Sequence, residues 1–213
     1  MLTVPLLLAL LAQAMPAGIT RTALLENDTV MIARLGMAPG AREEVHTHPF
    51  SAVVVQIGAG EVEMRAGPRR ETAPREPGHV DFIAAEMPHA AANVGPAPFD
   101  VVTVALKKDR ARGGVQPPSG SPAGITRSPL LDNPEARAAR VTFGPGAREA
   151  VHAHPFDMVV VQVTPGRMDV RVGETSETKD YAAGEVVWLP RDVPHAVANA
   201  GAKPFTVVSI GVK

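Results

Sequence analysis

Six of the seven histidines in this 213-residue chain fall into two sets with the same spacing: His46, His48 and His89, then His152, His154 and His195. The first two histidines of each set are two residues apart, so on a β-strand both imidazoles would leave the same face. A third imidazole from a distant strand would complete a set of nitrogen ligands suited to Fe, Ni, Cu or Zn. The alternative is a group of buried structural histidines. The repetition of the whole set favours metal binding.

The two histidine sets belong to a longer internal repeat. VHTHPFSAVVVQ at 45–56 recurs as VHAHPFDMVVVQ at 151–162, an offset of 106 residues (152 − 46), and MPHAAAN at 87–93 recurs as VPHAVAN at 193–199. Self-similarity on this scale indicates two homologous domains rather than a solenoid. We therefore predict domains at 15–107 and 123–213, joined by a linker rich in Gly, Pro and Ser at 108–122.

The elements that must position these histidines have the pattern of β-strands. Runs rich in β-branched residues at 101–107 and 207–213 close the two repeats, and the segments 61–67 and 167–173 alternate with a period of two. No segment combines a sustained helical period with caps. The sequence therefore predicts an all-β fold, with a sandwich or small barrel in each repeat.

Composition excludes several classes of partner and of chemistry. The net charge is −1 and no long basic block occurs, so nothing indicates a nucleic-acid partner or a polybasic membrane contact. The chain has no cysteine, which excludes disulfides and thiolate chemistry. Self-association into a homo-oligomer is left open.

The first residues are typical of a signal peptide. The apolar run from Leu2 to Leu11 is too short for a membrane span, which needs about 20 residues, and Ala12-Gln13-Ala14 follows it as a cleavage pattern. The basic residue that usually precedes such a run is missing, since the first Lys or Arg is Arg21. We expect residues 1–14 to be removed and the protein to be periplasmic or secreted. If the segment is retained as a first strand, the protein would instead be cytoplasmic.

The surroundings of the histidines resemble the two motifs of the cupin superfamily. The first motif, a glycine followed by five residues and His-x-His, fits at 40–48 and at 146–154. The second motif fits at 184–199, with Pro190 in place, and at 78–93, where Ala84 replaces the proline. The chain thus resembles a bicupin over residues 17–213. This resemblance implies two tandem double-stranded β-helix (jelly-roll) barrels, each with a divalent metal, such as Fe, Mn, Ni or Zn, on its three histidines.

The sequence departs from the cupin pattern at one ligand. Most metal cupins carry a glutamate four residues after the second histidine, and this chain has Ala52 and Met158 there. The candidate replacements are Asp157, present only in the second repeat, and Gln162, whose counterpart is Gln56. We assign Asp157 and Gln162 as candidate catalytic residues. Alternatively, the glutamine only satisfies backbone groups inside the barrel.

A ligand set of neutral imidazoles leaves the charge of a divalent metal uncompensated, which favours an anionic or enolisable small molecule. The resemblance covers three-histidine dioxygenases, oxalate-processing bicupins, isomerases, lyases and proteins that only bind a ligand. VVVQVTPGRMDV is also similar to small cupins associated with β-alanine catabolism. We predict a metal-dependent enzyme of the dioxygenase type, with a non-catalytic binding module as the alternative. Recurring arginines, such as Arg34 and Arg140, are candidates for receiving a carboxylate, although arginines are mostly solvent-facing.

Overall fold

The computed structural model describes residues 16–107 and 122–213. The predicted signal peptide and all but the last residue of the predicted linker lie outside the described residues. Within the described ranges the chain forms sixteen strands and no helix, so no helix there is long and apolar enough to cross a membrane. The all-β prediction is confirmed.

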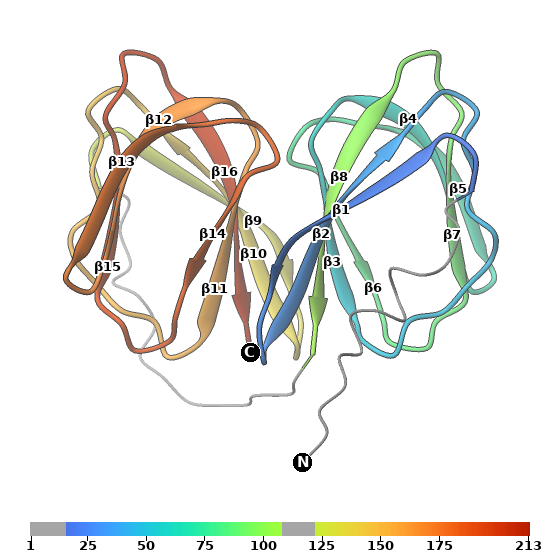
Figure 1. The fold of residues 1–213 in the computed structure, drawn as a ribbon, viewed down its shortest axis with the longest axis horizontal. Helices are drawn as coiled ribbons and strands as arrows, with labels where there is room; N and C mark the ends of the chain where they lie inside the picture. Colours follow the sequence, from blue (N-terminus) through green and yellow to red (C-terminus); the bar gives the residue numbers. More distant parts are fainter. Residues whose placement is uncertain (1–15, 108–121) are drawn as a thin grey trace.

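The strands form two barrels of eight strands each, which lie side by side (Figure 1). The first barrel comprises β1 (Ile19–Glu26), β2 (Val30–Met37), β3 (Ala52–Gln56), β4 (Gly60–Ala66), β5 (Arg69–Arg75), β6 (Val80–Ile83), β7 (His89–Asn93) and β8 (Phe99–Leu106). The second comprises β9 (Ile125–Asp132), β10 (Ala136–Phe143), β11 (Asp157–Gln162), β12 (Gly166–Val172), β13 (Thr175–Tyr181), β14 (Val186–Leu189), β15 (His195–Asn199) and β16 (Phe205–Val212).

Each barrel closes a five-stranded sheet against a three-stranded sheet. In the first barrel the orders are β1-β2-β8-β3-β6 and β5-β4-β7, and the second barrel repeats both orders with the equivalent strands. All paired strands are antiparallel. The last strand of each repeat lies between the second and third strands, a crossover that a simple meander lacks. This is the predicted jelly-roll topology.

The five-stranded sheets of the two barrels pack against each other. Val53 and Val55 of β3, together with Val159 and Val161 of β11, are fully buried in one apolar cluster that draws residues from both barrels. The intervening Val160 packs instead in the interior of the second barrel. Because strand side chains alternate between faces, these strands must be apolar on both sides. The valine runs in the sequence follow from this double burial.

Two equivalent polar contacts, one from each barrel, lie at the edge of this interface. Arg34 of the first barrel donates through Nη1 to the carbonyl of Ala183 in the second, at 3.1 Å. Arg140 of the second barrel donates through Nη2 to the carbonyl of Pro77 in the first, at 3.2 Å. These two arginines therefore join the barrels rather than bind a ligand.

Asp157 makes a further polar contact between the barrels. Its buried carboxylate accepts the hydroxyl of Thr29 at 3.0 Å and the backbone N–H of Arg191 at 2.9 Å. The equivalent residue of the first barrel, Ser51, accepts the N–H of Ala85 through its hydroxyl at 2.9 Å. The shared role of this position is to accept a backbone N–H of the turn before the strand that carries the third histidine.

Replacing Asp157 by Ala should lower the free energy of unfolding by about 2–4 kcal/mol, because the buried hydroxyl of Thr29 and the part-buried N–H of Arg191 lose their acceptor. Asp157→Ser should cost less, since serine accepts the equivalent N–H in the first barrel. Urea denaturation measures both values. A loss below about 0.5 kcal/mol for Asp157→Ala would contradict this structural role.

Candidate metal centre

Each barrel brings its three histidines together from two segments of the chain. His46 lies between β2 and β3, outside the named strands, and forms an isolated antiparallel bridge with His89, the first residue of β7. The bridge has two backbone hydrogen bonds, from His46 N to His89 O at 3.0 Å and from His89 N to His46 O at 2.9 Å. His152 and His195 form the same bridge in the second barrel. The expectation that His-x-His lies on a regular strand is wrong, because only one residue of the motif is paired.

The imidazole nitrogens converge in both barrels. The Nε2 atoms of His46 and His48 are 3.1 Å apart, as are those of His152 and His154. In each trio the three ligand atoms lie within 4.8 Å of one another. Two nitrogens that share a metal at roughly 2.0–2.1 Å lie about 2.9 Å apart at an angle of 90° and about 3.4 Å apart at a tetrahedral angle, so a separation of 3.1 Å falls between the two. The separations therefore fit one metal ion in each barrel.

Backbone carbonyls orient four of the six rings. In each case Nδ1 lies 2.8 or 2.9 Å from the carbonyl oxygen two residues earlier, an arrangement shared by His46, His89, His152 and His195. A neutral imidazole in this position donates its Nδ1–H to the carbonyl and leaves the Nε2 lone pair free. Such a partner on the non-ligating nitrogen is typical of histidines that bind metals.

Burial favours the neutral form of three of the six histidines: His48, His154 and His195. Burial, followed by the neighbouring His46, His89 and Arg21, lowers the pKa of His48 to about 4. The pKa of His154 is also lowered to about 4, again chiefly by burial. Burial lowers the pKa of His195 as well. Neutral imidazoles are the form that binds a metal, so these ligands need not lose a proton near pH 7.

Each trio lines a cavity inside its barrel. The cavity is about 370 Å³ in the first barrel and about 620 Å³ in the second. In the second, the apolar side chains of Met158, Val160 and Val207 form part of the wall, and the ring of Phe156 stacks on His154 with centroids 5.4 Å apart. Both volumes suit a small molecule, and the apolar walls would limit access of water.

The two candidate catalytic residues occupy different places. Gln162 is 1% exposed, donates its amide to the carbonyl of Thr164 at 2.6 Å, and has no hydrogen-bond partner for Oε1 within the described chain. It does not line the second cavity as described, although its counterpart Gln56 lines the first. Asp157 also lies outside the cavity lining. Strand alternation turns Met158 and Val160 towards the cavity and Asp157 towards the other barrel. The expectation that Asp157 places a carboxylate beside the metal site is therefore wrong.

An arginine that recurs in both cavities was not identified from the sequence: Arg21 in β1 and its counterpart Arg127 in β9. Arg127 forms an ion pair with Glu149, whose other oxygen accepts the N–H of Val197 at 3.3 Å. Burial lowers the pKa of Arg21, while the nearby carboxylate of Glu43 opposes this effect. The available signal was the repeated AGITR segment at 17–21 and 123–127, which ends on these arginines. Each cavity thus contains a permanently charged guanidinium group as well as the three histidines.

Purified protein should retain close to two equivalents of a first-row transition metal per chain. His48→Ala and His154→Ala should each remove about one equivalent, because a three-ligand site rarely survives the loss of one ligand. Elemental analysis of untagged protein measures the content, and His79→Ala, which alters the histidine outside both trios, is the control. Retention of both equivalents in either ligand variant would contradict the assignment.

Metal-free protein should lose stability as the pH falls from about 6.5 to about 5. In the unfolded chain His48 and His154 take up protons near their ordinary pKa of 6.5, whereas in the folded chain their pKa is about 4. The unfolded state therefore binds more protons in this window, and acid favours it. Urea denaturation at several pH values tests this, with His48→Gln/His154→Gln as the control that should show a flatter dependence. A wild-type stability as flat as that of the control would refute the prediction.

Comparisons with known proteins agree with this geometry. A family model described as the cupin domain matches residues 139–211. A germin-like protein of Arabidopsis thaliana (subfamily 2 member 2) is 32% identical over 90 residues, which is 41% of each chain. The present chain thus spans less than half of that relative's length. The beta-alanine degradation protein BauB of Pseudomonas aeruginosa is 30% identical over 95 residues, covering 45% of this chain and 99% of that protein.

Solved structures show the same fold at low sequence identity. AerE from Microcystis aeruginosa superposes with a TM-score of 0.78 at 13% identity, covering 92% of this chain and 93% of that one. A formate complex of oxalate decarboxylase from Lactobacillus farciminis gives a TM-score of 0.72 at 15% identity, with coverages of 92% and 82%. With both motifs around its histidines and a match to nearly the whole of a related protein, the chain belongs to the cupin superfamily.

Proposed function

We propose that this protein is a metal-dependent enzyme of the oxygenase type that acts on a small anionic or enolisable molecule. The observation that carries the proposal is the convergence of three imidazoles, among them His154 with its pKa lowered to about 4, in a cavity that also holds an arginine. Such a ligand set contributes no negative charge of its own. An anionic ligand would compensate the metal and contact the arginine at the same time.

Each part of the cavity has a distinct role in this proposal. The three histidines would hold a divalent metal, which would supply Lewis acidity and open coordination positions. Arg127, held by Glu149, would orient the anionic group of the substrate. The apolar wall around Phe156 and Val160 would exclude water and strengthen these charge interactions. Glu149, the one carboxylate in the described lining of the second cavity, is paired with Arg127, so the substrate should arrive already ionised.

Two relatives support the choice of a small carboxylate and a divalent metal. The Lactobacillus farciminis oxalate decarboxylase was solved with formate, and a Bacillus subtilis oxalate decarboxylase is described with Mn(II) centres. At sequence identities of 15% and 14%, these two structures show only that this chain shares their fold. The reaction itself is therefore our proposal.

Protein loaded with Fe(II) should consume dissolved oxygen with at least one member of a panel of diketones, catechols and hydroxy acids. The second barrel should carry most of this activity because its cavity is the larger one. His154→Ala should then abolish turnover, whereas His48→Ala should retain a measurable part. An oxygen electrode measures the rates, and metal-free protein is the control.

Two results would contradict parts of the proposal. Stabilisation by panel members without oxygen uptake, for the Fe, Mn and Ni forms alike, would favour the alternative of a non-catalytic binding module. Equal loss of activity in both histidine variants would refute the assignment of turnover to the second barrel.

A further inference from the structure

The two cavities share their histidines but differ in the charge of their walls. Each is lined by the repeated arginine and glutamate, Arg21 with Glu43 or Arg127 with Glu149. The other charged residues around the first cavity are three carboxylates and one lysine: Glu26, Glu44, Asp81 and Lys107. Around the second cavity the only other charged residue in the described lining is Arg137. The duplicated fold therefore presents two different electrostatic environments.

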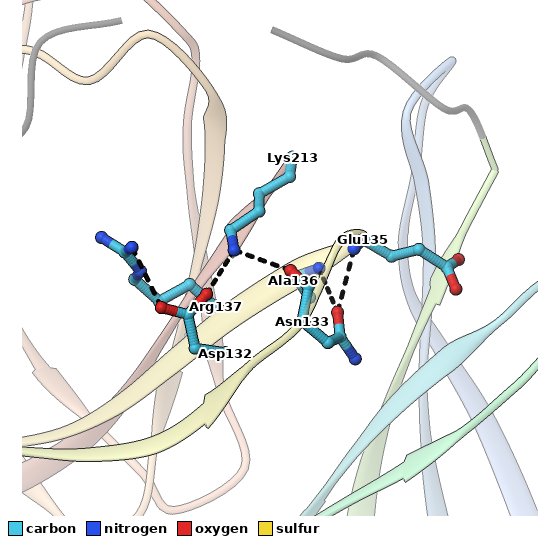
Figure 2. Close-up of polar contacts among 6 residues, drawn as sticks. All are labelled: Asp132, Asn133, Glu135, Ala136, Arg137 and Lys213. Atoms are coloured by element: carbon cyan, nitrogen blue, oxygen red, sulfur yellow. Dashed lines mark hydrogen bonds and ion pairs between the residues drawn. The ribbon is translucent and has the colours of Figure 1, made fainter. Parts of the chain in front are cut away.

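Arg137 in β10 adds a positive charge where the first barrel has none. Its counterpart in β2 is Met31 (137 − 31 = 106), and both side chains line their cavities. Figure 2 shows the guanidinium of Arg137 beside the carboxylate of Asp132, with Nη2 and Oδ2 3.0 Å apart, and the ammonium of Lys213 on the same carboxylate. Two cations therefore share the carboxylate of Asp132, while the carboxylate of Glu135 points away from both (Figure 2).

The equivalent cluster of the first barrel is balanced. Lys107 pairs with Glu26, and Met31 stands where the second cation would be. Both clusters thus pair an acidic residue with a lysine, Glu26 with Lys107 and Asp132 with Lys213, and Arg137 is an additional cation in the second.

Two further differences between the barrels make the lining of the first cavity more negative. Glu44 lines the first cavity, and its counterpart in the second is Ala150. Asp81 also lines the first cavity, and its counterpart is the uncharged Val187. Asp81 lies 3.5 Å from Nε of Arg75 and 3.3 Å from Nε2 of His79, so part of its charge is compensated. Glu44 is accordingly the larger contribution to the more negative character of the first cavity.

We propose that the second barrel binds a small dianion, such as a dicarboxylate, between its histidine centre and the pair Arg127 and Arg137, whereas the first barrel selects a neutral or singly charged ligand. The inference rests on the metal centre of the proposed function and adds a substrate class for each barrel. The side chain of Arg137 is 41% exposed, so its charge acts on the cavity from the edge and its effect on an anion should weaken at high salt. Arg137 is then the specificity-determining residue of the second barrel.

Binding of malonate and of its neutral diamide to Co(II)-loaded full-length protein tests the inference. His46→Ala/His48→Ala leaves the second centre, His152→Ala/His154→Ala leaves the first, and the visible Co(II) spectrum reports ligand binding. We expect malonate to bind the second centre at least tenfold more tightly than the first, and the diamide to differ by less than threefold. Arg137→Met should weaken malonate binding to the second centre about tenfold, and Met31→Arg should strengthen binding to the first.

The matched control is Arg167→Met, which removes an exposed arginine that pairs with Asp180 at 3.3 Å outside the cavity lining. It should leave malonate affinity unchanged. Equal malonate affinities at the two centres, or no effect of Arg137→Met, would overturn the inference. If a histidine variant fails to fold, a two-phase malonate titration of wild-type protein that loses its tight phase in Arg137→Met gives the same answer, and a single phase refutes it.

Failure of this inference can be distinguished from failure of the proposed function. Discrimination between the two centres without oxygen uptake would refute the oxygenase proposal and support the inference. Failure of either centre to retain Co(II) in the folded wild-type protein would refute the metal centre and the inference together.

Discussion

The packing of one five-stranded sheet against the other is the constraint on which most of this structure depends. It occupies one face of β3 and β11, so only the opposite face of each strand remains for a cavity. Residues along a strand alternate between these faces, and no residue can serve both. Each residue of β3 and β11 therefore either packs in the interface between the barrels or lines the interior of its own barrel. The same burial favours apolar residues, here mainly valine, on both faces of these strands.

The histidine centres are built mainly from backbone contacts. A two-bond bridge between His46 and His89, repeated by His152 and His195, brings the ligand segments together without a full strand pairing. Carbonyl partners at Nδ1 then direct Nε2 towards the common point. Burial keeps His48 and His154 neutral near pH 7, which for a metal ligand is an advantage rather than a cost. Because these contacts involve backbone atoms, both copies retain them despite different neighbouring side chains.

Duplication has preserved the ligands and changed the surroundings. Both barrels keep three histidines, an arginine and a glutamate at equivalent positions. The walls beyond them differ in volume and in charge, as at Met31 and Arg137. A residue that differs between the copies, such as Asp157, need not belong to a site. In this case the difference places a carboxylate opposite Thr29 in the interface between the barrels.

The sequence by itself determined the all-β architecture, the duplication and the grouping of the histidines, because periodicity, offset and motif spacing are properties of the chain alone. The boundaries of the signal peptide and the linker stay predictions. Only the tertiary structure decided which face of β11 carries Asp157. The alternation of side chains can be counted along the chain, but packing against the other barrel decides which of the two faces is turned towards the cavity. The tertiary structure likewise decided that Arg21 and Arg127 face the cavities. A surface-type residue on a predicted strand becomes part of a site only when the barrel closes around it.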